Sequence, residues 1–280
     1  MAVGGSVYMA LPANPDRPTV SPTTLLAYRI DRDRWDSPPT PPKRAYSLVV
    51  AKDRLIAFGG RPRAGPPGYI LRRDGRSWRP LPSDPLPRRP PRGLYWNGRR
   101  LVLISSVPLG RDGMNRLLAR AATLELGARR WRRLPDSHSV LYGRLFWVRV
   151  GHRLVSPWLG DGSPHYQWGR PLGGILDPEK GIWSDLPDPP ERSKYEFGTG
   201  VVTRTRGHYS FPHGLVLDTT RNGWILLPPL PTGWGFEIGG ATVVSMGRNL
   251  LAFGGPRFRR ASEGRLVNDA WVWSPPPPAE

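Results

Sequence analysis

The hydrophobic positions of this chain recur in short runs that are separated by glycine, proline, asparagine and aspartate. Examples lie at 47–50 (SLVV), 101–104 (LVLI), 145–150 (LFWVRV) and 241–244 (ATVV). Apolar runs of about four to eight residues bounded by such turn-forming residues are typical of β-strands. No ten-residue stretch has the period of an amphipathic helix, and the 33 Gly and 35 Pro residues would interrupt helices repeatedly. The pattern predicts an all-β fold.

A tryptophan recurs five times in the same local setting. The five residues are Trp35, Trp78, Trp131, Trp183 and Trp224, at steps of 43, 53, 52 and 41 residues. Each has a large apolar residue seven positions before it and a proline-containing tail after it (WDSPP, WRPLP, WRRLP, WSDLP and WILLPP). A repeat of roughly 40–50 residues with one tryptophan per unit is typical of β-propellers, in which each repeat forms one blade. The spacing predicts a propeller of four-stranded antiparallel blades.

The repeats divide the chain into six expected blades within a single domain. The blades cover approximately 1–39, 44–82, 92–135, 140–187, 195–231 and 235–275, followed by a proline-rich tail at 275–280. Trp273 aligns with Leu176, so the next repeat tryptophan would fall at position 280, where the chain instead has PPPPAE. Because proline cannot donate to a strand ladder, the closing blade is predicted to be incomplete. Either residues upstream of Met1 complete it, in which case this chain is truncated, or the ring closes with three strands there.

Two segments carry a resemblance to a known family. Residues 54–60 (RLIAFGG) and 249–255 (NLLAFGG) are apolar strands that end in two glycines, and six residues separate Tyr28 from Trp35. This combination resembles the kelch repeat over nearly the whole chain. The chain departs from the repeat where Ser-Ser, Ser-Pro and Ser-Phe stand in place of the diglycine, at 105–106, 156–157 and 210–211. The resemblance implies blades with strands A (innermost) to D (outermost), whose B–C and D–A loops share one face.

The chain is strongly basic. Its formal net charge is +19 and its estimated pI is 11.3, and all but four of its 41 basic residues are arginine. A GC-rich coding bias, which raises Arg, Pro, Gly and Ala together, is one explanation. An anionic partner such as nucleic acid, an acidic glycan or an acidic protein face is the other. Either way, the charge predicts non-specific binding of polyanions at low salt.

The face formed by the B–C and D–A loops is the predicted binding site, because arginines and aromatic residues alternate there. Such a mixture suits recognition by charge together with stacking. The predicted binding residues are Arg61, Arg63, Arg116, Trp158, Asp161, His165, Tyr166, Trp168, Arg170, Trp234, Arg257, Arg259 and Arg260. The long loop at 158–172 is the strongest candidate, its alternative role being a lid over the channel. Arg92 and Arg120 belong to the same expected basic ring, whereas Arg99, Arg100 and Arg153 are expected at A–B turns on the opposite face.

Several chemistries are not expected. The chain has no Cys, which excludes disulfides, thiolate catalysis and the Cys–Tyr radical site of galactose oxidase, a copper enzyme of kelch-like architecture. His165, His208 and His213 could converge on a metal ion, but the i, i+5 spacing of His208 and His213 along a strand directs their imidazoles to opposite faces. No phosphate loop, HExxH or GxSxG motif occurs. We therefore expect no metal, no cofactor and no catalytic residue.

The preferred interpretation is a non-catalytic binding module or interaction scaffold for an anionic or carbohydrate-like ligand or a protein partner. The alternative is a sugar-modifying enzyme, of mutarotase, isomerase or hydrolase type, with a pocket at the channel mouth formed by Asp161, His165 and Trp168. A third possibility is a protein–protein platform without a small ligand. The chain is expected to be a monomer and, without an apolar stretch of about 20 residues or a positively charged signal region, cytoplasmic. A signal upstream of Met1 would change that location.

Overall fold

The structure is a computed structural model of the 280-residue chain. It describes residues 2–3, 6–12, 23–42, 47–59, 66–87, 92–108, 116–138, 141–142, 147–156, 173–188, 203–205, 208–210, 215–218, 222–226, 242–246, 249–253, 256–258, 264–266 and 270–274. Among these residues there is no α-helix, and one short 3₁₀ helix, η1 (Ile30–Arg32), is present. The predicted all-β class and the four-stranded antiparallel sheets are confirmed. No helix of this part is long and apolar enough to cross a membrane.

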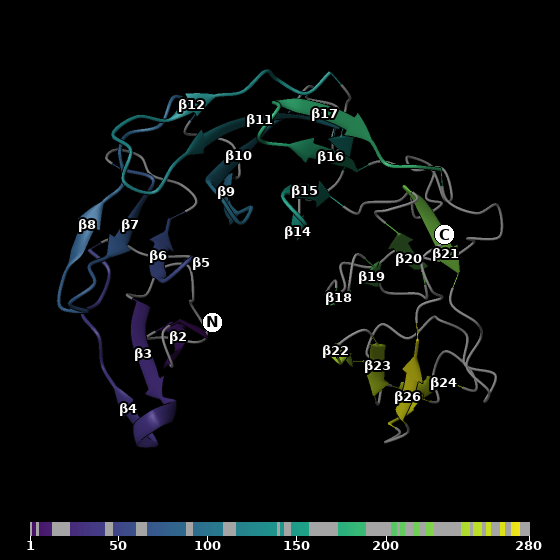
Figure 1. The fold of residues 1–280 in the computed structure, drawn as a ribbon, viewed down its shortest axis with the longest axis horizontal. Helices are drawn as coiled ribbons and strands as arrows, with labels where there is room; N and C mark the ends of the chain where they lie inside the picture. The colour runs from purple at the N-terminus through teal and green to yellow at the C-terminus, as the bar shows by residue number, and fades with distance from the viewer. Residues whose placement is uncertain are drawn as a thin grey trace. The chain divides into compact units, whose positions relative to one another are not determined.

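The strands form five successive meanders, followed by a three-stranded sheet and a separate hairpin (Figure 1). The first sheet contains β1 (Ala2–Val3), β2 (Ser6–Pro12), β3 (Thr23–Arg29) and β4 (Arg34–Asp36). The second contains β5 (Ser47–Ala51), β6 (Arg54–Phe58), β7 (Gly68–Leu71) and β8 (Trp78–Pro80). The third contains β9 (Arg92–Trp96), β10 (Leu101–Pro108), β11 (Arg116–Leu124) and β12 (Arg132–Arg133), and β13 (Leu141–Tyr142) follows it in the chain.

The remaining sheets follow the same order. The fourth contains β14 (Val148–Val150), β15 (Arg153–Ser156), β16 (Gly174–Asp177) and β17 (Ile182–Asp185). The fifth contains β18 (Thr203–Thr205), β19 (His208–Ser210), β20 (Leu215–Asp218) and β21 (Gly223–Leu226). The sixth pairs β22 (Thr242–Met246), β23 (Asn249–Phe253) and β26 (Ala270–Trp273), while β24 (Pro256–Phe258) and β25 (Gly264–Leu266) form a separate hairpin. The described part of the sixth sheet therefore has three strands.

Each four-stranded meander has two distinct ends. Because neighbouring strands are antiparallel, the turn from the first to the second strand and the turn from the third to the fourth lie at the same end. We call this the turn end of the sheet. The connection from the second to the third strand lies at the opposite end, which we call the loop end. The two ends separate the residues that the sequence assigns to the two faces.

The chain divides into two compact units. One unit comprises Met1–Arg111, Arg116–Val140 and Asp177–Ile182, and the other comprises Asp112–Asn115, Leu141–Leu176 and Trp183–Glu280. Inside each unit, the first strands of successive sheets are neighbours: β5 lies beside β9, and β18 lies beside β22. Successive sheets are therefore stacked face to face along their first strands.

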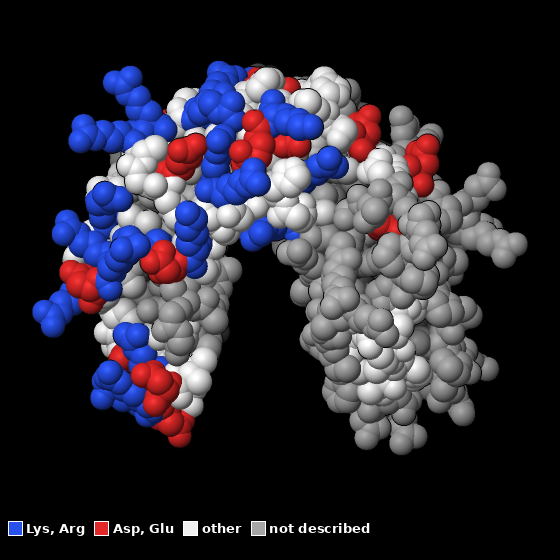
Figure 2. Space-filling model, viewed as in Figure 1, with Lys and Arg blue, Asp and Glu red and all other residues white. Residues whose placement is uncertain are grey.

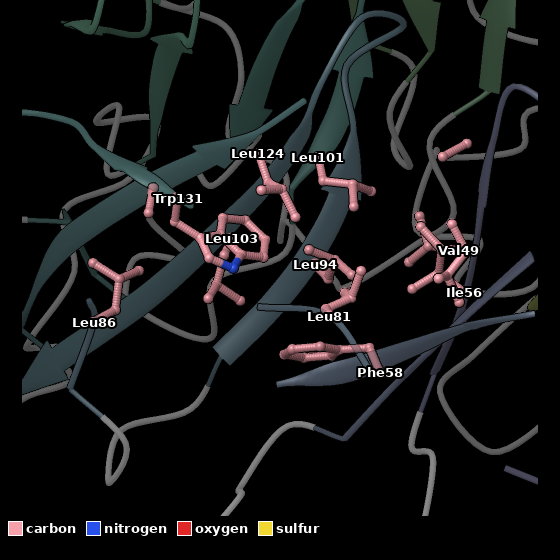
Figure 3. Close-up of a cluster of buried hydrophobic side chains, with 13 residues drawn as sticks. Val49, Ile56, Phe58, Leu81, Leu86, Leu94, Leu101, Leu103, Leu124 and Trp131 are labelled. Carbon is pink, nitrogen blue, oxygen red and sulfur yellow. The ribbon is translucent and has the colours of Figure 1, made fainter. Parts of the chain in front are cut away.

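The core of the first unit lies between the second and third sheets. β6 is buried from Leu55 to Phe58, and β10 is buried from Leu101 to Ser106, so neither central strand has a solvent-facing side there. Figure 3 shows Phe58 and Ile56 of β6 in one cluster with Leu101 and Leu103 of β10. Continuous apolar runs are needed where both faces of a sheet are covered, and each fully buried Leu or Phe contributes roughly 1.5–3 kcal/mol.

A smaller core in the second unit also forms between two successive sheets. Val150, Val155 and Ile175 come from the fourth sheet, and they pack with Leu217 from β20 of the fifth sheet. Trp224 of β21 packs against this cluster. The two cores show that a sheet buries its faces against the next sheet of the chain.

The repeat tryptophans join one sheet to the tail of the preceding one. The indole N–H donates to a proline carbonyl in three pairs: Trp78 to Pro39 at 2.7 Å, Trp131 to Pro82 at 2.9 Å and Trp224 to Pro187 at 2.8 Å. In each pair the acceptor is the proline four residues after the preceding repeat tryptophan. The proline tails of the repeat therefore act as hydrogen-bond acceptors for the following sheet as well as ending a strand.

Trp35 of the first sheet differs from the other repeat tryptophans. Its side chain is 53% exposed, whereas Trp131 is 9% exposed. It contacts the ring of Tyr28, with the centroids 5.2 Å apart, but its indole N–H has no hydrogen-bond partner among the described residues. Trp35 is therefore a natural reference for the effect of the tryptophan–proline bond.

We expect Trp131→Phe to lower the free energy of unfolding by about 1–3 kcal/mol, because the part-buried Pro82 carbonyl loses its donor. Trp35→Phe should change it by no more than about 0.5 kcal/mol, since that indole is half exposed and donates to nothing. Chemical denaturation followed by circular dichroism measures both variants. Equal shifts of the two unfolding midpoints would show that the bond does not stabilise the fold.

Candidate functional site

Most of the predicted binding residues lie outside the described part of the chain. They are Arg61, Arg63, Trp158, Asp161, His165, Tyr166, Trp168, Arg170, Trp234, Arg259 and Arg260. Of the other two, Arg116 is the first residue of β11 and Arg257 lies in β24, and only their backbone is described. The loop-face site therefore stays a prediction.

The described arginines of the loop end are neutralised by carboxylates. Arg92 was expected in an exposed basic ring, and this is wrong: its side chain is fully buried and forms an ion pair with Asp84, which is 5% exposed. Asp84 is fixed in turn by the Leu86 N–H, 3.0 Å from its Oδ1. Arg120 likewise pairs with Asp136, with 3.0 Å between Nε and Oδ2. Neither arginine is available to an external anion.

The turn ends of the second and third sheets hold an excess of positive charge. Among the residues of their tight turns and the adjoining strand ends, nine are basic and three are acidic. The basic residues are Lys52, Arg54, Arg72, Arg73, Arg76, Arg99, Arg100, Arg129 and Arg130, and the acidic residues are Asp53, Asp74 and Glu125. Figure 2 shows many Lys and Arg side chains over the part of the surface where these two sheets lie, interspersed with acidic side chains. The charge of the described part is therefore concentrated opposite to the predicted face.

Three of these arginines are used within the fold. Arg54 donates to the Leu71 carbonyl at 3.0 Å, which ties the two turns of the second sheet together. Arg73 pairs with Asp53 at 3.3 Å, and Arg100 contacts Glu125 at 3.1 Å. These guanidinium groups stabilise the turns. They contribute less uncompensated positive charge than their number suggests.

Five other guanidinium groups form no ion pair or hydrogen bond with the part of the chain that the structure describes. They belong to Arg72, Arg76, Arg99, Arg129 and Arg130, and we call this set the basic turn end. Its members come from three turns: β7–β8, β9–β10 and β11–β12. Because no described acidic side chain pairs with them, these exposed groups are candidates to bind an anion.

The turns that hold the basic turn end are internally fixed. Gly75, Gly98 and Gly127 have φ angles of 70°, 100° and 95°, which a glycine adopts without strain. The Asn97 side chain accepts from the backbone N–H groups of Arg99 and Arg100 at 3.0 and 2.7 Å. These contacts set the backbone from which the free guanidinium groups project.

A buried polar network supports the β9–β10 turn from behind. Asn97 is fully buried, and its Nδ2 donates to Glu179 Oε1 at 3.1 Å. Glu179 also contacts Arg100 at 3.4 Å, and Arg132 donates to the Pro178 carbonyl at 3.2 Å. The turn at 177–182 is thereby held against the third sheet, within the first unit.

The turn end of the first sheet, in contrast, is electrically balanced. Arg29 donates to Asp36 at 2.8 Å, and this hydrogen bond lowers the pKa of the Asp36 carboxyl, with a smaller contribution from the positive charge of Arg34. The Tyr28 hydroxyl donates to Asp33, and this bond raises the pKa of Tyr28. The basic turn end therefore begins at the second sheet.

Comparison with known proteins does not assign the site. No model of a protein family matches the chain, and no curated protein sequence matches it. Within the described residues, no group of three or more His, Asp or Glu side chains is arranged to hold a metal ion. Of the basic turn end, only Arg99 was expected at this end of the sheets, because the number of arginines in a loop does not show which are unpaired. The available signal was arginine near a turn glycine, as in DGR, NGRR and GARR.

We expect Asp84→Asn to lower the free energy of unfolding by about 3–5 kcal/mol, because it removes the carboxylate of a buried ion pair and leaves the Arg92 charge in the core. Asp53→Asn is the matched control, since its pair with Arg73 is exposed and is worth at most about 1 kcal/mol. Denaturation midpoints compare the two. A loss of similar size in both variants would contradict the structural role of the buried pair.

The lowered pKa of Asp36 predicts a pH dependence. Its folded-state pKa lies below the ordinary value of 3.8, so the ionised carboxylate stabilises the fold at neutral pH. This stabilisation is lost as pH falls from about 4 through the folded-state pKa. Arg29→Gln should move the Asp36 titration upward, towards 3.8, in a carbon-detected NMR titration. An unchanged Asp36 midpoint in Arg29→Gln would show that this hydrogen bond is not the cause.

Proposed function

We propose that the chain is a six-bladed, kelch-like β-propeller, with an incomplete closing blade, that serves as a non-catalytic binding module for an anionic partner. The successive meanders, the neighbouring first strands and the bonds from Trp78, Trp131 and Trp224 to the preceding proline tails support this architecture. Fold alone does not define function. The functional part of the proposal therefore depends on the site.

The observation that carries the proposed function is the basic turn end. Its five exposed guanidinium groups have no carboxylate partner among the described residues, and together they create a positive potential over adjacent turns. Bound oxyanions would neutralise it. Arginine suits this role because its planar fork donates two hydrogen bonds to one phosphate, sulfate or carboxylate group.

The loop-face residues provide a second, separate candidate surface within the same proposal. The alternative function, a sugar-modifying enzyme, depends on Asp161, His165 and Trp168. These three residues lie outside the described part of the chain, so this function stays an alternative.

The triple variant Arg76→Ala/Arg99→Ala/Arg130→Ala tests the proposed function. We expect it to bind long-chain inorganic polyphosphate about tenfold more weakly than the wild type, since three exposed contacts of about 0.5 kcal/mol each are lost. Binding is measured by fluorescence anisotropy at 150 mM salt, and circular dichroism checks the fold.

The matched control is Arg32→Ala/Arg34→Ala/Arg133→Ala. These three arginines are also exposed, but each already has a carboxylate partner: Asp31 at 3.5 Å, Asp36 at 3.3 Å and Asp136 at 3.0 Å. The control lowers the net charge by the same three units. If it weakens polyphosphate binding as much as the first variant does, only the net charge matters and the proposed site is wrong.

A further inference from the structure

The basic turn end also indicates which class of anion it binds; this inference rests on the proposed function. Its five arginines lie on three tight turns of two neighbouring sheets. The residues of those turns, 72–77, 97–100 and 125–130, include no aromatic side chain. Three properties of these turns indicate the class of anion: their composition, their rigidity and their spacing.

Stacking is not available to a ligand at this surface. Three tryptophans flank the turns, and each is used within the fold: the indoles of Trp78 and Trp131 are bonded to Pro39 and Pro82, and Trp96 packs against the core. Single-stranded nucleic acids rely on aromatic side chains that stack on their bases. A partner with exposed charged groups and inaccessible aromatic rings fits the surface better.

The rigidity of the turns favours a partner with a fixed charge spacing. Asn97 holds the β9–β10 turn, and the Asp74 side chain accepts from the Arg76 N–H at 2.9 Å. In the β11–β12 turn, the Ala128 N–H donates to the Glu125 carbonyl at 3.0 Å. A flexible glycan or acidic peptide would lose conformational entropy in matching such a fixed array, whereas a rigid polymer would not.

The spacing of the turns fits a duplex. The β9–β10 and β11–β12 turns of the third sheet are separated by two strand spacings, which is about 10 Å. The grooves of a DNA duplex are about 6 and 12 Å wide, so guanidinium groups on the two turns can reach phosphates on both sides of a groove. A duplex also carries one negative charge per about 1.7 Å of axis, which supplies enough phosphates for all five arginines.

We infer that the basic turn end binds the phosphate backbone of a double-stranded nucleic acid without reading its base sequence. Arg99 contacts one side of a groove, and Arg129 and Arg130 contact the other. Arg72 and Arg76 of the second sheet extend the contact along the backbone. The inference assigns these arginines to phosphates alone, and such contacts carry no sequence information.

The test compares four probes on the full chain: a 24-base-pair DNA duplex, one of its single strands, heparin and polyglutamate. Each is titrated between 50 and 200 mM salt. With five phosphate contacts, the slope of log affinity against log salt for the duplex should be about −4.5, which corresponds to a loss of about 500-fold over this range. A duplex of unrelated sequence should bind within about twofold of the first.

The two triple variants then separate the site from the net charge. Arg76→Ala/Arg99→Ala/Arg130→Ala should reduce the duplex slope by about 2.7, since each lost phosphate contact accounts for about 0.9. Arg32→Ala/Arg34→Ala/Arg133→Ala should leave the slope unchanged. Circular dichroism and the unfolding midpoint confirm that both variants fold.

The outcomes distinguish this inference from the proposed function. If the single strand, heparin or polyglutamate binds more tightly than the duplex, and Arg76→Ala/Arg99→Ala/Arg130→Ala weakens that binding, the duplex inference is overturned while the anion-binding function stands. If both triple variants change every slope equally, or if no probe binds above 50 mM salt, the proposed function fails as well.

Discussion

The interaction on which the architecture depends is the hydrogen bond from a repeat tryptophan to the proline tail of the preceding sheet. It occurs from Trp78, Trp131 and Trp224, each time with the proline four residues after the previous repeat tryptophan. A carbonyl partly removed from solvent is stabilised by a donor, and a tail rich in proline offers few N–H groups of its own. The indole supplies that donor together with a large apolar surface. One residue therefore fixes both the distance and the register between successive sheets.

This constraint also explains where charge can be placed. The packed faces of the sheets exclude charged groups unless they are paired, as Arg92 is with Asp84. The sheet ends remain open to solvent, and the tight turns there accept polar residues at little cost. At the turn ends of the second and third sheets, many of these tolerant turn positions are occupied by arginine. The fold therefore sets the position of the basic turn end, while the sequence of the turns sets its charge.

The sequence was sufficient to predict the class of fold, because the apolar runs and the tryptophan repeat are local signals. It could not distinguish a buried arginine from an exposed one. Arg92 was assigned to a basic ring because position in a loop does not reveal that Asp84 lies beside it. Conversely, Arg129 and Arg130 were not predicted to bind an anion, because only the folded sheet shows whether a carboxylate lies near them.

For the same reason, a high arginine content does not by itself identify a binding site. A coding bias raises the number of arginines at every tolerant position, and it places them next to acids as often as away from them. In the first sheet, Arg29 and Arg34 are matched by Asp36, and at the loop end Arg120 is matched by Asp136. The five arginines of the basic turn end are not matched, although Glu125 lies in the same turn as two of them. Glu125 pairs with Arg100 instead. Whatever the source of the arginines, the pairing within the fold determines which of them can meet a partner.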